Sequence, residues 1–273
     1  MDLWKNPFPR SKTLAELPYN LISMTAFLIA WQIVSLGVYY VRGVPFPAPV
    51  ETFLRLFSLL GGGKLYGVSI YGHLSNSLVR WTVGFSLAAV VGLLLGIAVG
   101  YFHVLSEIIM PSIHVLQLIP GLAWIPITLL LFGLGDTAAV FMIFVTAFTP
   151  IVINTAGGTR SIDRKYIRAA KMMGARDATI FFRIILPGAL LQIINGLRIG
   201  LANGWRVLVA AEMIVGVASG LGYSIIQSRW SLDFEAAFVC LILICMIGLI
   251  VEKLIFGMIE RKTMERLGLR EGE

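Results

Sequence analysis

The chain has 273 residues, of which 58% are hydrophobic and only 14% are charged, and its formal net charge is +7. With Gly counted in place of Tyr, the apolar share rises to roughly 65%, against 45–50% in soluble domains. A soluble domain of this length cannot bury that much apolar surface. The composition therefore excludes a soluble enzyme, a disordered protein and a secreted disulfide scaffold. It predicts an all-α bundle of helices that crosses a membrane several times.

Six stretches are long and apolar enough to predict about six transmembrane helices. They are residues 19–41, 81–102, 108–135, 137–159, 188–216 and 236–251. The first is interpreted as a retained helix, because it is too long for the apolar region of a signal peptide. Pro111, Pro120 and Pro126 interrupt the third span, and Pro150 interrupts the fourth. Carbonyl groups freed at such breaks can line a pathway, or the breaks can be kinks satisfied by neighbouring helices.

The connection at residues 42–73 contains three alternating prolines, at 45, 47 and 49, which predict an extended segment. Residues 51–60 then predict a short amphipathic helix that three glycines close. This helix is expected at the membrane interface, where it could also receive a partner.

Basic residues in the connections predict the direction of the spans. With the N-terminus inside, 15 Lys and Arg lie on the cytoplasmic side and 4 on the other, and seven of the 15 fall in residues 159–187. The predicted organisation is a cytoplasmic tail (1–18), a first helix (19–41), an external loop (42–73), a core (74–256) with a cytoplasmic loop (159–187), and a cytoplasmic tail (257–273). Topology explains the positive charge, so a nucleic-acid partner is not expected.

Two predicted helices carry glycine at every fourth position, which lets helix backbones approach closely in lipid. The positions are Gly92, Gly96 and Gly100 in one helix, and Gly196, Gly200 and Gly204 in the other. These stripes favour tight packing inside the bundle or against a second copy of the chain, and the sequence leaves both open.

The loop at 159–187 has the pattern of two short helices. Ser161 or Asp163 can cap the first, which carries an apolar stripe formed by Tyr166, Ala169, Ala170 and Met173. Gly174 is expected to end that helix in a left-handed conformation. Asp177 can cap the second, which Leu186 and Pro187 are expected to stop before the next span. Such a pair can lie on lipid as an interfacial element, or it can dock a cytoplasmic partner.

The spacing of this loop resembles the cytoplasmic-loop signature of ABC importer permeases of type I. The signature is Glu-Ala-Ala, three residues, Gly, nine residues, Ile-x-Leu-Pro. The loop residues that the resemblance assigns to the ATPase contact are Arg168, Ala169, Ala170, Met173, Gly174, Ala175, Ile184, Leu186 and Pro187. Arg168 stands where the family usually has Glu, so it would need an acidic partner. Further segments between about 72 and 261, such as 118–126, 132–135 and 220–223, resemble permeases for sulfonates, taurine, nitrate and bicarbonate.

The resemblance implies a multi-pass permease of the plasma (inner) membrane with several partners. A second permease copy would complete the pathway, two ATPase subunits would supply energy from ATP and Mg²⁺, and an extracytoplasmic binding protein would deliver a small anion. The chain itself would bind no cofactor and perform no catalysis, and it has no Gly-x-x-x-x-Gly-Lys-Ser/Thr motif for ATP. A carrier or channel that works without ATP is the alternative, but it leaves the loop signature unexplained.

Polar residues inside the spans are the candidates for the pathway. Arg206 lies about 27 Å along a helix of about 43 Å, and it either faces a water-filled cavity or pairs with Glu212 or another helix. Asn154 and Asn203 are the other candidates. Arg80 is expected to anchor the second span at the interface, and Arg198 to reach the interface from its helix. The three histidines and two cysteines are too scattered to predict a metal site.

Overall fold

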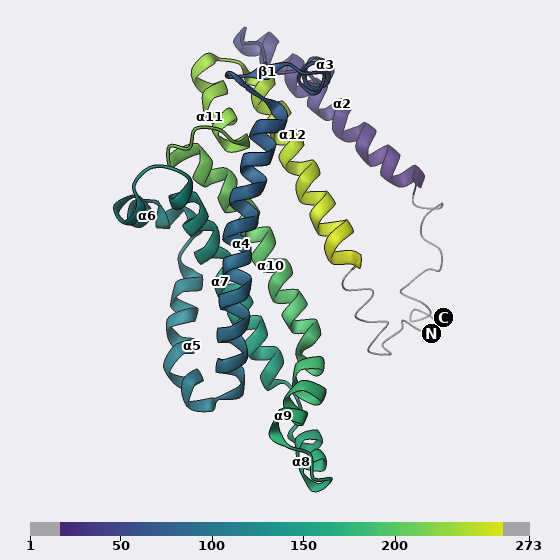
Figure 1. Cartoon of the computed structure of the whole chain (residues 1–273). Coiled ribbons are helices and arrows are strands. Elements are labelled where there is room, and N and C mark those ends of the chain that lie inside the picture. Colours follow the sequence, from purple (N-terminus) through teal and green to yellow (C-terminus); the bar gives the residue numbers. More distant parts are fainter. Residues whose placement is uncertain (1–16, 259–273) are drawn as a thin grey trace.

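Five long apolar helices dominate the computed structural model, which describes residues 17–258 (Figure 1). They are α2 (Leu17–Arg42), α4 (Ile70–Tyr101), α7 (Asp136–Arg160), α10 (Leu186–Ile214) and α12 (Phe234–Ile250). Each has a segment long and apolar enough to cross a membrane. A bent pair of helices brings the number of candidate spans to six if it is counted as one span, so the predicted all-α membrane bundle is confirmed. The predicted tails fall mostly in residues 1–16 and 259–273, outside the described residues.

The third predicted span is broken rather than continuous. Helix α5 (His103–Leu118) is followed by the short η1 (Gly121–Trp124) and by α6 (Ile125–Phe132), and the pair is bent by 101°. Pro120 lies at the break, where it has no N–H to donate and holds Ile119 out of the helical conformation. Helix α5 begins directly after Phe102, so a single residue separates it from α4.

Helix α7 is held between α4 and α10, and the two glycine stripes form both contacts. A Cβ placed on Gly96 would lie 2.6 Å from Cβ of Thr155, and one on Gly200 would lie 2.8 Å from the Ala147 carbonyl oxygen. Such distances leave no room for a side chain, so the backbones touch. Both stripes therefore pack inside one subunit, which decides the alternative that the sequence left open.

A small assembly covers one end of the bundle, called here the α11 end. It consists of α3 (Pro49–Leu60), a two-stranded antiparallel ribbon of β1 (Lys64–Leu65) and β2 (Val68–Ser69), and α11 (Leu221–Ser231). The amphipathic helix α3 was predicted, whereas α11 and the ribbon were not. Tyr66 joins the ribbon to α11 through hydrogen bonds of 3.0 Å with Ser228 and Ser231.

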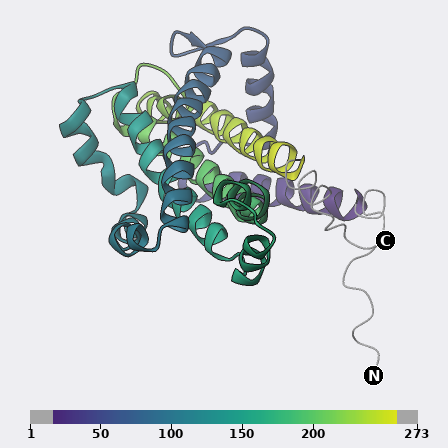
Figure 2. The ribbon, with the colours of Figure 1, turned by 60° about the horizontal axis from the view of Figure 1, so that its bottom comes forward.

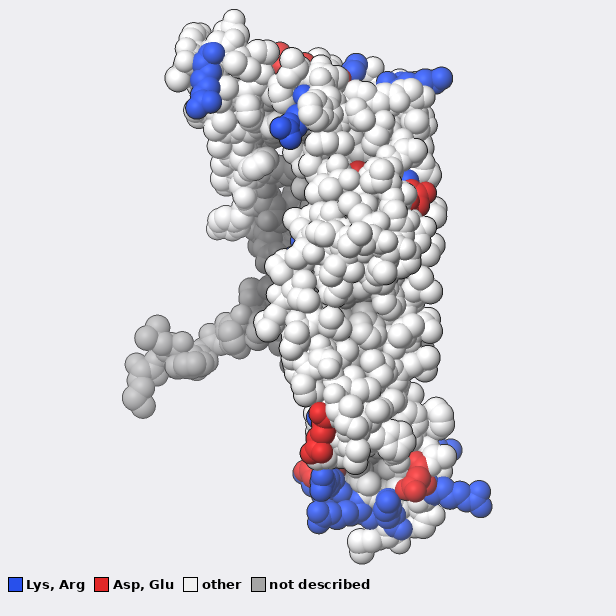
Figure 3. Space-filling model, turned by 90° about the vertical axis from the view of Figure 1, so that its left-hand side faces the viewer, with Lys and Arg blue, Asp and Glu red and all other residues white. Residues whose placement is uncertain are grey.

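The opposite end, called the α8 end, consists of α8 (Arg164–Met172), α9 (Asp177–Ile180) and the π-helical segment η2 (Phe181–Ile185). A second π-helical segment, η3 (Val251–Phe256), follows α12. Figures 1 and 2 place α2 along one side of the bundle and the bent pair α5–α6 along another. Charged side chains gather near the two ends in Figure 3, and the face between them is almost free of charge, as expected for a surface in lipid.

Candidate functional site

The loop at the α8 end folds as a capped helix and a glycine turn. Asp163 is the N-cap of α8 and accepts a hydrogen bond of 2.9 Å from the Lys165 N–H. Hydrogen bonds from the Lys165 backbone and side chain lower the pKa of the Asp163 carboxyl. Gly174 has φ +79°, so it adopts the predicted left-handed conformation.

The apolar stripe of α8 is turned mostly to the outside. Ala170 is 3% exposed and packs with Ile180 and Ile185, together with Ile167. Tyr166 and Met173, however, are 57% and 81% exposed. The loop thus packs along one edge of the stripe, and the rest of it remains available to a partner.

The second half of the loop signature joins the loop to α10. Ile184 packs on the buried cluster of Ala170 and Ile180. Leu186 and Pro187 begin α10, and η2 continues into it without a break. The prediction that this pair stops the second short helix was wrong, because proline in the first turn of a helix costs no backbone hydrogen bond.

The outward face of α8 is basic. Lys165 and Lys171 are paired with Asp163 and Asp177 at 3.0 and 3.3 Å. Arg164 and Arg168 are exposed, four residues apart on one face, and neither has an ion pair within residues 17–258. The face therefore presents two guanidinium groups that no described carboxylate compensates.

A polar cavity of about 270 Å³ lies at the break of the third span. Arg206 and Asn203 of α10 line it, as do Gln117 of α5 and Thr146 of α7. Hydroxyl Oγ1 of Thr146 is buried and has no hydrogen-bond partner in the described part of the chain. Arg206 is exposed to this cavity and to a neighbouring, more apolar one, and it forms no ion pair with any described residue. Of the two interpretations of Arg206, the structure favours the cavity.

The other pathway candidates lie elsewhere. Asn154 donates to the Pro150 carbonyl at 2.8 Å and accepts from Asn195 at 3.2 Å, and it does not line the cavity of Arg206. Glu212 is 1% exposed and belongs to a separate polar cluster. Arg198 forms an ion pair of 3.1 Å with Glu252 of η3, and both residues line the neighbouring, more apolar cavity.

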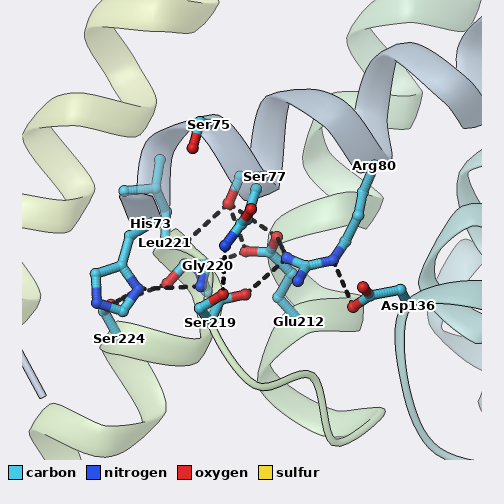
Figure 4. A network of polar contacts seen from close by, with 12 residues as sticks. His73, Ser75, Ser77, Arg80, Asp136, Glu212, Ser219, Gly220, Leu221 and Ser224 are labelled. Atoms are coloured by element: carbon cyan, nitrogen blue, oxygen red, sulfur yellow. Dashed lines mark hydrogen bonds and ion pairs between the residues drawn. The ribbon is translucent and has the colours of Figure 1, made fainter. Parts of the chain in front are cut away.

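This separate cluster lies near the α11 end and is centred on Arg80 of α4 (Figure 4). The Arg80 guanidinium donates to Glu212 at 2.7 Å, to Asp136 at 2.8 Å and to the Ser219 carbonyl at 2.7 Å. The prediction that Arg80 anchors the helix at the interface was wrong, since its side chain is only 6% exposed. The available signal was a buried acidic residue, Glu212, inside the predicted span 188–216, which requires a basic partner such as Arg80.

The same cluster extends to a buried histidine. His73 accepts from the Gly220 N–H at 3.1 Å through Nδ1, so Nε2 carries the proton that is donated to the Leu65 carbonyl at 2.9 Å. Within residues 17–258 no three His, Cys, Asp or Glu side chains are arranged to hold a metal ion.

Comparisons with known proteins agree with this architecture. The sequence profile of the family described as "Binding-protein-dependent transport system inner membrane component" matches residues 88–265. The nitrate import permease protein NrtB of Synechocystis is 34% identical over 242 residues, which are 86% of this chain and 85% of the relative. The taurine transport system permease protein TauC of Escherichia coli is 32% identical over 270 residues, which are 99% of this chain and 94% of the relative.

A solved structure supports the same fold. It is titled as an inward-facing conformation of the MetNI methionine ABC transporter, and it matches 77% of this chain and 98% of its own chain with a TM-score of 0.58 at 20% identity. The chain thus belongs to the family of binding-protein-dependent transport system inner membrane components and is the permease subunit of an ABC importer.

Proposed function

We propose that this permease imports a small anion and that Arg206 attracts it. Relatives named for nitrate, taurine and bicarbonate transport fit such a cargo, although their substrates differ from one another. The observation that carries the proposal is the guanidinium of Arg206, which lines a polar cavity and has no ion pair with any residue from 17 to 258. A cation in a membrane protein is costly unless water or a counterion reaches it. An anion in the cavity would also find hydrogen-bond donors on Asn203, Gln117 and Thr146.

The test is uptake into vesicles that contain the permease with its ATPase and receive the binding protein. Labelled nitrate, taurine and bicarbonate are offered separately. Arg206→Gln is expected to lower uptake of the accepted anion at least tenfold, and Arg206→Lys to retain part of it. The matched control is Arg229→Gln, which removes an arginine that lies over Trp230 on α11, away from the cavity. Normal uptake by Arg206→Gln would refute the proposed anion site.

We further propose that the loop at 159–187 is the contact with the ATPase. Membership in the family implies an ATPase and a binding protein as partners, and the chain is not itself catalytic. ATP and Mg²⁺ would be bound by two ATPase subunits, and a second copy of this permease would complete the pathway. This assignment takes the place of the alternative in which the chain is a carrier or channel that works without ATP.

The outward face of α8 specifies the chemistry of the partner groove. Arg164 and Arg168 require acidic residues opposite them, and Met172 and Met173, which are 89% and 81% exposed, require an apolar socket. Arg168→Glu is therefore expected to weaken both copurification of the ATPase and stimulation of ATP hydrolysis by the binding protein. An acidic-to-basic change in the groove should restore them. If Arg168→Glu copurifies as much ATPase as Arg229→Glu does, the proposed charge pairing is wrong.

The α8 end then faces the cytoplasm and the α11 end faces the outside. The dense basic charge of the loop supports this orientation, because Lys and Arg are retained on the cytoplasmic side. A single cysteine introduced at Arg176 should resist a membrane-impermeant maleimide in intact cells and react after permeabilisation. Reaction in intact cells would reverse the orientation.

A further inference from the structure

Arg80 joins three helices through two carboxylates that differ in their surroundings. Glu212, near the end of α10, has a side chain with 0% exposure, whereas Asp136, the first residue of α7, has a side chain that is 68% exposed. Both ion pairs are short, at 2.7 and 2.8 Å. One guanidinium thus holds a buried partner and a surface partner at the same time (Figure 4).

The contact between Arg80 and Glu212 is buried and supported by further hydrogen bonds. Its carboxylate also accepts from the Ser77 hydroxyl at 2.8 Å and from the Gly222 N–H at 2.9 Å. A Cβ on Gly220 would overlap this carboxylate, so the loop before α11 closes directly over it. Separating Arg80 from Glu212 would leave a buried charge without its partner, which is strongly unfavourable.

The ion pair between Arg80 and Asp136 is the easier of the two to separate. The Asp136 side chain is 68% exposed although that of Arg80 is only 6% exposed, and an ion pair with one exposed partner is easier to open than a fully buried one. Asp136 follows a turn in which Gly133 and Gly135 have φ +70° and +125°, and the Gly135 N–H donates to the Val215 carbonyl at 2.7 Å. This turn leads back through α6 to η1, which borders the cavity of Arg206. A movement of the turn would therefore change the wall of that cavity.

We propose that Arg80 is a positioning residue that clamps the α6–α7 turn against the α10–α11 loop, with Glu212 as its permanent partner and Asp136 as its releasable one. Release of Asp136 lets the turn move away and opens the cavity toward the α11 end. The link to transport rests on the proposed function, but the clamp itself is a property of the permease.

The direct test measures access to the clamp without any partner protein. Ser219→Cys is placed in a chain in which Cys240 and Cys245 are Ala, because Ser219 is only 8% exposed and its carbonyl is bound by Arg80. The rate of reaction with a membrane-impermeant maleimide is measured with and without Asp136→Asn. A fully exposed ion pair corresponds to a change in the open population of about two- to fivefold, and the Arg80 side of this pair is buried, so the rate should rise by at least that factor. Glu51→Gln, which removes an exposed carboxylate at the same end, should leave the rate unchanged.

A second measurement connects the clamp to transport. In the full complex with ATPase and binding protein, Asp136→Asn is expected to raise ATP hydrolysis in the absence of binding protein and to reduce its stimulation, with normal copurification. Arg80→Lys, which replaces the planar guanidinium by a compact ammonium without the fixed fork that reaches Asp136 through Nε and Glu212 through Nη1, should behave like Asp136→Asn. A purely structural role predicts lower yield for Arg80→Lys and no change in either readout for Asp136→Asn, and that result would overturn the proposal. Faster labelling with unchanged hydrolysis would keep the clamp and refute its link to transport.

Discussion

Replacing Gly96 by Ala tests the contact between α4 and α7 with a single methyl group. The added Cβ would lie 2.6 Å from Cβ of Thr155 and 3.0 Å from the Val152 carbonyl oxygen, well inside ordinary contact distance. The two helices must then separate, and overpacking of this kind costs roughly 1–3 kcal/mol. The better helix propensity of Ala returns about 1 kcal/mol. We therefore expect a net loss of about 0–2 kcal/mol, visible as a lower apparent Tm in one fixed detergent.

Gly157 provides the matched control on the partner helix. Nothing lies within 4 Å of a Cβ at Gly157, so Gly157→Ala gains about 1 kcal/mol of helix propensity with no clash. The apparent Tm of Gly157→Ala should rise while that of Gly96→Ala falls. Thr155→Ala keeps the Cβ that Gly96→Ala strikes but removes Cγ2, which would lie 3.0 Å from the added atom, so the double variant should recover only a small part of the loss. Equal shifts of the same sign for the two glycine variants would show that the close approach of α4 and α7 is not what stabilises the bundle.

Three further predictions concern the cluster and the loop. Glu212→Ala leaves the buried Arg80 without its main counterion. The free energy of unfolding should therefore fall by roughly 3–5 kcal/mol, and the yield of folded protein should drop sharply. A normal yield would contradict the burial of the pair. Gly174→Val puts a branched side chain at φ +79° on the exposed turn, so transport should fall at normal expression; unchanged transport would mean that the turn is not part of the contact. Because the folded pKa of Asp163 is lowered, its cap stabilises α8 above the ordinary carboxyl pKa and is lost as the pH falls through the lowered value. The protection factor of the Lys165 amide against hydrogen exchange should fall over that acidic range in the native chain and not in Asp163→Asn.

The spans were predictable because they depend on length and apolar content, which are local properties. Five of them appear as long helices, and the third is interrupted at the predicted Pro120. Helix α11 was not predicted, since its eleven residues carry neither a full span nor a clear amphipathic pattern. Its place depends on a contact with Glu212, ten residues before Gly222, and on one with His73, which lies 147 residues before Gly220.

The candidate site was predictable in part for the same reason. The loop cap at Asp163 and the turn at Gly174 follow from neighbouring residues, and both are as predicted. The role of Arg80 was missed because its partners are 56 and 132 residues away. Only the folded chain brings those charges together, and a lone arginine near a helix start is typical of an interface anchor.

Because the loop continues directly into α10, the two can tilt together as one rigid helical segment. From Asp177 to Ile214 the chain runs as one helical rod of 38 residues, about 57 Å long. A tilt of about 10° around its midpoint displaces each tip by roughly 5 Å, without any change in the rod itself. Since α7 is wedged against this rod through the Gly196 and Gly200 contacts, the two must swing together. If α8 is the ATPase contact that we propose, a push on it would be delivered at the opposite end of the bundle, where Arg80 and Glu212 lie.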